Sequence, residues 1–242
     1  MKIGIFVALP REARAIFGSN GWLEKKGIFL KKIIKNTLEI EITVCGQGKK
    51  GAQKAFFYFE QKKIKKIINL GVAGALEETL TQGELILPNL LISNEGKIAS
   101  LKESKKIENI LKSHTYPFKI CNLFTSKEAV SSPFEKRQIH TKYGACAVDM
   151  EAFYIGRLCK NSSLTFYSIK AISDSLDHLL PKEVLNCLDD MGGMNYARLF
   201  KNVVLKPALI KHLIILGRGF DIATKRLKGV TELIIPLMEH IL

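Results

Sequence analysis

The sequence predicts an α/β fold whose functional site lies at the carboxyl ends of its β-strands. Short, continuous apolar runs, which are typical of buried strands, alternate with helical patterns along the chain. Glycines gather where several of the predicted strands end, and there they let a ligand approach the backbone closely. The chain has 242 residues, which fits one α/β domain.

The first half of the chain begins with a strand and a helix. The apolar run from Met1 to Leu9 predicts a strand that is buried on both faces. Pro10 opens a helix, because its missing N–H is harmless in the first turn, and Gly18 ends it. The other elements expected here are strands at 28–34, 37–45 and 64–70, a turn at Lys35-Asn36, and a helix at 52–63.

The second half continues the alternation and ends in helices. We expect strands at 84–93, 118–123, 145–148 and 164–172, and helices at 100–113, 133–143 and 150–160. Pro88 interrupts the first of these strands, because proline cannot donate to a neighbouring strand. From Asn195 onward the pattern is mostly helical.

The charge balance is basic, with 37 Lys and Arg against 23 Asp and Glu, giving a net charge of +14. Such a balance suggests nucleic acid, anionic lipid or an anionic substrate as a partner, or else a plain bias toward lysine. Aromatic residues make up 8% and are not interleaved with basic ones as in a base-stacking surface. Nucleic acid is therefore not the expected partner, although a non-catalytic basic nucleic-acid-binding protein remains the alternative class.

The five cysteines and five histidines suggest neither a disulfide framework nor a metal site. The cysteines are odd in number and form no CxxC pair, which favours buried free thiols in a reducing cytoplasm. The histidines lack metal-ligand spacing such as HExxH. We expect a cytoplasmic protein with no metal and no cofactor.

Two glycine-rich segments follow predicted strands. Gly46, Gly48 and Gly51 have GxGxxG spacing, and such a loop can present backbone N–H groups to an anion or a ribose. A dinucleotide site would also need an acid about 20 residues on, at a strand end, but Glu60 lies in a predicted helix. A tight turn is the alternative. The segment 71–74 could admit a ligand or serve helix–sheet packing.

Acidic residues follow three predicted strands. A carboxylate at Asp149 or Glu151 could bind two vicinal hydroxyls of a sugar, and the alternative is helix capping. Asp174 could protonate N7 of a purine, with a helix cap formed by Ser173 or Asp174 as the alternative. Glu12 could orient a water molecule, or be an exposed glutamate of a first helical turn.

Taken in order, these motifs resemble the nucleoside phosphorylase/nucleosidase superfamily over about residues 1–178. The branch they resemble contains the methylthioadenosine/S-adenosylhomocysteine nucleosidases. The hopanoid-associated phosphorylase group is the more similar subgroup, through segments 8–14, 147–151, 171–174 and 180–181 and the downstream Lys206-Pro207. The resemblance implies one three-layer domain in which helices flank a central mixed sheet.

The resemblance also implies roles for individual residues. Asp174 would be the general acid at purine N7, supported by Ser173. Glu151 would bind the ribose 2′- and 3′-hydroxyls, with Met150 against the sugar, and Glu12 would position the nucleophilic water. Ala73 and Gly74 would line the ribose and base region.

The chain departs from the family pattern at three places. Segment 126–131 lacks the usual adenine-stacking aromatic residue, so Val130 would supply an apolar wall. Asp149 replaces the usual glutamate. Segment 69–71 lacks the arginine with which phosphorylases hold phosphate, so Arg11, Lys49 or Lys50 would have to bind it.

These features predict an enzyme that cleaves the N-glycosidic bond of a purine nucleoside, releasing adenine. Adenosylhopane, a lipid nucleoside, is the first candidate substrate, and methylthioadenosine or S-adenosylhomocysteine is the alternative. The resemblance implies a homo-oligomer, with a dimer favoured.

The C-terminal segment 205–242 is expected to be a helical extension packed on the catalytic domain of residues 1–204. Its apolar residues recur near helical spacing, with basic residues between them. It either packs on the sheet or contacts an anionic membrane or a lipid tail from the cytoplasmic side. Its apolar stretches are too short to span a bilayer.

Overall fold

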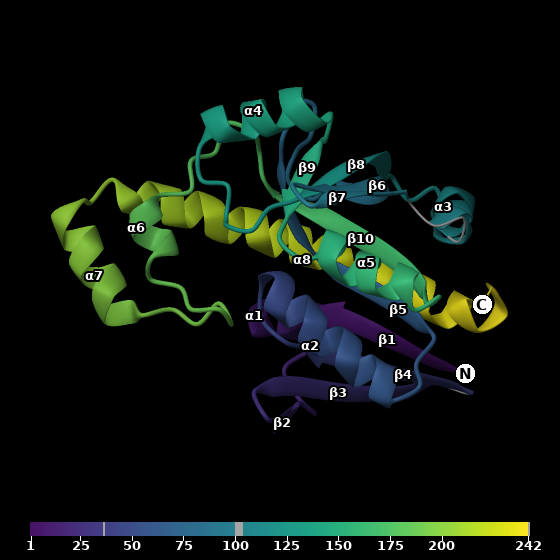
Figure 1. The fold of residues 1–242 in the computed structure, drawn as a ribbon. Helices are drawn as coiled ribbons and strands as arrows, with labels where there is room; N and C mark the ends of the chain where they lie inside the picture. Colours follow the sequence, from purple (N-terminus) through teal and green to yellow (C-terminus); the bar gives the residue numbers. More distant parts are fainter. Residues whose placement is uncertain (36, 100–103, 242) are drawn as a thin grey trace.

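The computed structural model describes residues 1–35, 37–99 and 104–241. It shows a mixed β-sheet flanked by helices, which confirms the predicted fold class (Figure 1). The expected turn residue Asn36 and the first four residues of the helix expected at 100–113 lie outside the described residues.

The strands match the apolar runs and add two elements that the sequence did not indicate, β2 and β7. Their bounds are β1 Lys2–Val7, β2 Leu23–Lys25, β3 Ile28–Lys35, β4 Leu38–Val44, β5 Lys66–Ala75, β6 Leu85–Ser93, β7 Gly96–Ala99, β8 Lys119–Thr125, β9 Ala147–Asp149 and β10 Thr165–Asp174. The strand order is β10-β6-β8-β9-β5-β1-β4-β3-β2, with β7 paired to β6. Pro88 lies where the register between β6 and β8 shifts, as its missing N–H predicts.

The sheet closes on itself at one end. Strand β5 pairs with β1 and β9, and it also pairs in parallel with β10. Because β10 pairs with β6 and the path then runs through β8 and β9 back to β5, these five strands form a closed ring. The ring brings Gly74, Val148 and Asp174 into register with one another.

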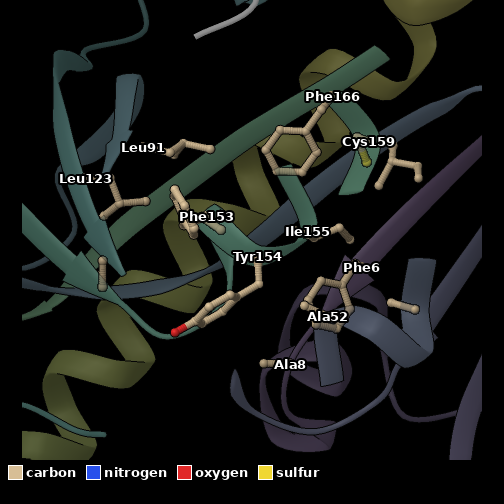
Figure 2. Packing of buried hydrophobic residues seen from close by; sticks show 14 of the residues in the cluster. Phe6, Ala8, Ala52, Leu91, Leu123, Phe153, Tyr154, Ile155, Cys159 and Phe166 are labelled. Atoms are coloured by element: carbon tan, nitrogen blue, oxygen red, sulfur yellow. The ribbon is translucent and has the colours of Figure 1, made fainter. Parts of the chain in front are cut away.

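Helices cover both faces of the sheet. Their bounds are α1 Pro10–Phe17, α2 Gly48–Gln61, α3 Ser104–Ser113, α4 Pro133–Tyr143, α5 Ala152–Asn161, α6 Lys182–Leu185, α7 Tyr196–Leu205 and α8 Leu209–Ile241. Helices α2 and α5 pack on one face, where Phe6, Ala52, Phe153 and Phe166 meet (Figure 2). Helices α1, α3 and α8 cover the other face.

Close helix–sheet packing explains one glycine of β1. A Cβ at Gly4 would lie 2.8 Å from the ring of Phe59 on α2, closer than carbon atoms can approach. The absence of a side chain at Gly4 therefore sets how near α2 lies to the sheet.

In the C-terminal segment, residues 209–241 form one long helix, as the helical spacing predicted. Helix α8 buries Ala223, Leu227 and Val230 and packs along β10 and β5. Helices α6 and α7 project from the body beside the start of α8 (Figure 1). Within the described residues, no helix has a stretch that is both long and apolar enough to span a bilayer.

The cysteine prediction was wrong at two positions. Cys121 and Cys146 form a disulfide with a Cα–Cα distance of 6.1 Å, linking β8 to the residue before β9. These cysteines are 25 residues apart, so only the pairing of β8 with β9 brings them together. Cys45, Cys159 and Cys187 are buried free thiols, as predicted.

Candidate active site

A cavity of about 260 Å³ lies where β1, β5, β9 and β10 end. Its lining includes every residue to which the resemblance gives a catalytic or nucleoside-binding role, namely Glu12, Ala73, Gly74, Val130, Met150, Glu151, Ser173 and Asp174. A larger hollow of about 610 Å³ lies between β2, β3 and α2, but its lining is basic and apolar and has no carboxylate. The smaller cavity is therefore the candidate active site.

Asp174 is the last residue of β10 and both of its carboxylate oxygens have partners. The Ser173 hydroxyl donates to Oδ1 at 2.8 Å, and Lys136 Nζ donates to Oδ2 at 2.5 Å. A Cβ on Gly74 would lie 3.0 Å from Oδ2, so the neighbouring strand leaves room for this carboxylate by having no side chain there. The next helix begins only at Lys182, so the helix-cap alternative for Ser173 and Asp174 was wrong.

Glu12 is buried, with 3% of its surface exposed, so the expectation of an exposed first-turn glutamate was wrong. Its carboxylate accepts hydrogen bonds from the backbone N–H groups of Leu9, at 3.2 Å, and Val72, at 2.9 Å. Burial raises the pKa of Glu12, while the Val72 N–H and the charge of Lys170 oppose that rise. The glutamate is thus held at the carboxyl end of β1, facing the cavity.

Asp149 is fixed by an ion pair and two further hydrogen bonds. Lys170 Nζ lies 2.8 Å from Oδ2, and both side chains are almost fully buried. Asp149 also accepts from the Thr125 hydroxyl at 2.6 Å and from the N–H of Ala152, the first residue of α5, at 2.9 Å, although Glu151 and not Asp149 occupies the N-cap position. Burial lowers the pKa of Lys170, but the carboxylates of Asp149 and Glu151 outweigh this, so the net pKa is raised.

Glu151 reaches from the start of α5 to the start of α2. Its Oε1 accepts the N–H of Gly48 at 2.8 Å. Helix α2 begins at Gly48, earlier than predicted, so of the expected glycine-rich loop only Gly46 and Gln47 precede the helix. Burial raises the pKa of Glu151 to about 7, the charge of Lys170 lowers it, and that of Asp149 raises it further. Since the N–H groups of Gly46 and Gln47 donate to backbone carbonyls, the loop is a structured turn whose amides bind protein atoms.

This raised pKa predicts how stability depends on pH. The folded protein holds the Glu151 proton up to about pH 7, whereas the ordinary pKa is 4.5. The free energy of unfolding should therefore fall as pH rises from 4.5 to 7, by about 3 kcal/mol from this group. Urea denaturation across this range should show a shallower fall for Glu151→Gln. Equal slopes for the two proteins would contradict the prediction.

The three residues considered for phosphate, Arg11, Lys49 and Lys50, lie outside the cavity lining. Arg11 lies 4.6 Å above the ring of Phe220 and 3.6 Å from Asp221, and its side chain is largely exposed. Lys49 is on α2, where its Nζ lies 3.1 Å from Glu95.

Sequence reasoning missed two buried lysines beside the acidic residues, Lys170 and Lys136. Lys170 could have been noticed in the sequence, since it is the only charged residue of the predicted strand 164–172. No signal in the sequence points to Lys136, because it lies in a helix rich in charged residues and is buried only by tertiary packing.

A profile of the phosphorylase superfamily matches residues 2–189. The chain therefore belongs to the phosphorylase superfamily, as the motifs predicted. The 5′-methylthioadenosine/S-adenosylhomocysteine nucleosidase of Buchnera aphidicola from Schizaphis graminum is 30% identical over 202 residues, covering 74% of this chain and 86% of the relative. A DeoD-type purine nucleoside phosphorylase of Streptococcus thermophilus is 31% identical over 125 residues, covering 47% of this chain and 58% of the relative.

Solved structures of low sequence identity share the fold. The S-adenosylhomocysteine nucleosidase of Streptococcus pyogenes aligns with a TM-score of 0.76 at 17% identity, covering 98% of this chain and 97% of the other. Futalosine hydrolase of Helicobacter pylori aligns with a TM-score of 0.72 at 17% identity, covering 96% and 97%. The predicted enzyme class, a nucleoside phosphorylase or nucleosidase, is confirmed, and the comparisons favour it over a non-catalytic nucleic-acid-binding protein.

Proposed function

We propose that this protein hydrolyses the N-glycosidic bond of an adenine nucleoside, with water rather than phosphate as the nucleophile. The proposal rests on the charged residues that line the cavity. The charged residues lining it are Glu12, Glu128, Asp149, Glu151 and Asp174, and the described lining contains no lysine or arginine. A lining with carboxylates and no cation disfavours a phosphate anion, and its ionised carboxylates favour a cationic ribosyl transition state.

In this reaction, the bond between C1′ of the ribose and N9 of adenine breaks, and its electron pair moves into the purine. A proton from Asp174 to N7 makes the base a better leaving group. Glu151 accepts hydrogen bonds from the 2′- and 3′-hydroxyls, and Met150 packs against the sugar. A water molecule held by Glu12 attacks C1′, and Glu12 takes its proton.

The test is base release with and without phosphate. The expected products are adenine and a free ribose derivative, formed at the same rate in phosphate-free buffer. A requirement for phosphate, with a ribose 1-phosphate as product, would show phosphorolysis instead.

An apolar groove favours a large, apolar 5′ substituent on the nucleoside, as in adenosylhopane. This groove of about 460 Å³ adjoins the cavity and shares Leu180 with it. Leu179, Pro181 and Leu209 also line it. The names of the relatives favour methylthioadenosine or S-adenosylhomocysteine as the second candidate. Measuring kcat/KM for these two and for an adenosine with a long 5′-alkyl chain ranks the candidates.

We further propose that helix α7 contacts an anionic lipid surface, where such a substrate resides. Tyr196, Phe200 and Val204 recur every four residues along α7 and are 76%, 72% and 62% exposed. Arg198 and Lys201 lie on the same helix, and the net charge of +14 favours an anionic surface.

We expect the protein to sediment with anionic liposomes at low salt and to be released at high salt. Replacing Tyr196, Phe200 and Val204 by Ser should abolish this binding, whereas the same change at the exposed Phe57 of α2 should not. Protein that stays in the supernatant at low salt would refute the proposal. We also propose that the protein is a homodimer, as the resemblance implies. Analytical ultracentrifugation without liposomes tests this.

A further inference from the structure

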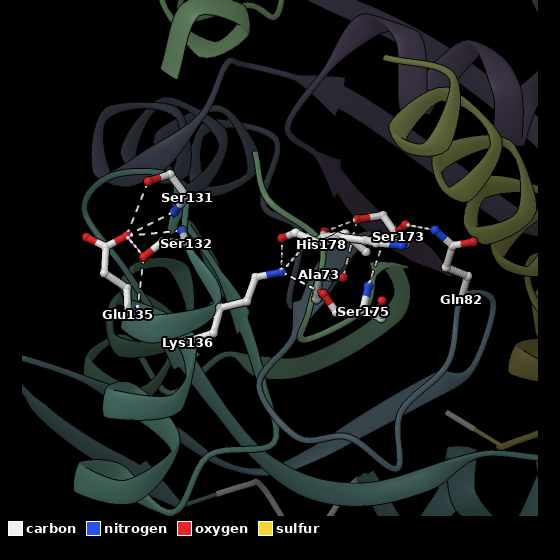
Figure 3. A network of polar contacts seen from close by, with 10 residues as sticks. Ala73, Gln82, Ser131, Ser132, Glu135, Lys136, Ser173, Ser175 and His178 are labelled. Carbon is white, nitrogen blue, oxygen red and sulfur yellow. Dashed lines mark hydrogen bonds and ion pairs between the residues drawn. The ribbon is translucent and has the colours of Figure 1, made fainter. Parts of the chain in front are cut away.

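Lys136 is fully buried, and its ammonium group donates hydrogen bonds to Asp174 and to the loop that follows it. Its Nζ lies 2.5 Å from Asp174 Oδ2, 2.8 Å from the carbonyl of Ser175 and 3.3 Å from that of His178 (Figure 3). An ammonium group has three N–H donors, and three acceptors of this protein surround it. None is left for a substrate, so Lys136 can act only through Asp174.

The local sequence explains how a lysine comes to lie there. Ser132 caps α4 by accepting the N–H of Glu135, and the Glu135 carboxylate accepts the N–H groups of Ser131 and Ser132. This capping box fixes the first turn of α4, and Lys136 follows it directly. The Ser131 carbonyl accepts the N–H of Leu180, which ties this turn to the loop after β10.

We infer that Lys136 is a positioning residue for the general acid. It fixes the plane of the Asp174 carboxylate, together with Ser173 on the other oxygen, and keeps a positive charge beside it. This inference rests on the proposed function, because it assigns Lys136 a task in base protonation. Sequence motifs place the acid itself, and the structure adds the residue that orients it.

The experiment compares Lys136→Met, Lys136→Arg and a control, Arg137→Met. Arg137 is the next residue of α4, but it forms surface ion pairs with Asp177 and Glu78. We expect Lys136→Met to lower kcat about 10- to 100-fold through misplacement of the acid, with little change in KM. Lys136→Arg should recover part of the loss, and Arg137→Met should behave as wild type.

A double variant separates a role through Asp174 from a general structural role. If Lys136 acts through the carboxylate, Lys136→Met should cause no further loss in an Asp174→Asn background. A further loss of the same size there, or a wild-type kcat for Lys136→Met, would overturn the inference. Should Lys136→Met fail to fold, Lys136→Gln provides the comparison, because it keeps N–H donors without the charge.

A measurement without turnover distinguishes this inference from the proposed function. Carbon-13 NMR follows the carboxyl of Asp174, identified by the signal that is lost in Asp174→Asn. At one fixed pH, its chemical shift should change in Lys136→Gln, which removes the charge beside the carboxylate, and should stay as in the wild type in Arg137→Met. An unchanged chemical shift in Lys136→Gln overturns the inference even when base release is observed, whereas absence of base release with a changed chemical shift overturns only the proposed function.

Discussion

Replacing Asp174 by Asn should lower kcat for base release by at least about 100-fold while the protein stays folded. A positioned general acid contributes roughly 10²–10⁴ to a rate, and an amide cannot supply the proton. The amide fills nearly the same volume, and its one acceptor oxygen can keep the hydrogen bond from Lys136, while its NH2 group can donate to the Ser173 hydroxyl. Stopped assays of free adenine measure kcat, and a thermal melt shows whether the variant is folded.

Asp177→Asn is the matched control for this experiment. Asp177 lies three residues further along the chain, is largely exposed and pairs with Arg137 at the surface. Its kcat should stay within about twofold of the wild type, since exposed ion pairs contribute only about 0–1 kcal/mol. An Asp174→Asn protein with near-normal adenine release would refute the assignment of the general acid.

Replacing Lys170 by Met should destabilise the protein by about 3–5 kcal/mol. Lys170 forms a buried ion pair with Asp149, and its charge also acts on Glu12 and Glu151. Removing it leaves carboxylates buried with no compensating cation, which is the costly way to break a buried pair. Urea denaturation at pH 8 measures the loss.

Two comparisons check that this loss comes from the buried charge. Lys119→Met removes a more exposed lysine, which pairs with Glu77, and should change stability by no more than about 1 kcal/mol. The loss in Lys170→Met should shrink as pH falls toward 4.5, because burial has already raised the pKa of Glu12 and Glu151 and they become neutral first. A loss independent of pH would point to packing instead.

The sequence predicted those parts of the fold that local patterns encode. Continuous apolar runs indicated β1, β4 and β10, and Pro10 and Gly18 correctly bounded α1. The short strands β2 and β7 were missed because three or four residues give no readable periodicity. The closure of the sheet through β5 and β10 was not predictable, since it depends on pairing between distant segments.

For the site, motif order predicted which acids line the cavity, but not what holds them. Glu12 is buried because β5 supplies the Val72 N–H, a contact across 60 residues. The pairing of Lys136 with Asp174 spans 38 residues and has no sequence signature. The roles of these acids could therefore be predicted only through the resemblance to a family, and the buried cations beside them are seen only in the tertiary contacts.

Because β5 pairs with β10, the protein can become active only late in its synthesis. Strand β5 (Lys66–Ala75) leaves the ribosome long before its parallel partner β10 (Thr165–Asp174). This edge of β5 therefore stays without its partner strand while nearly 100 further residues are made. An unpaired, apolar strand edge readily joins other chains. A nascent or truncated chain ending before residue 165 should therefore need a chaperone to remain unaggregated, and it would lack Asp174 altogether.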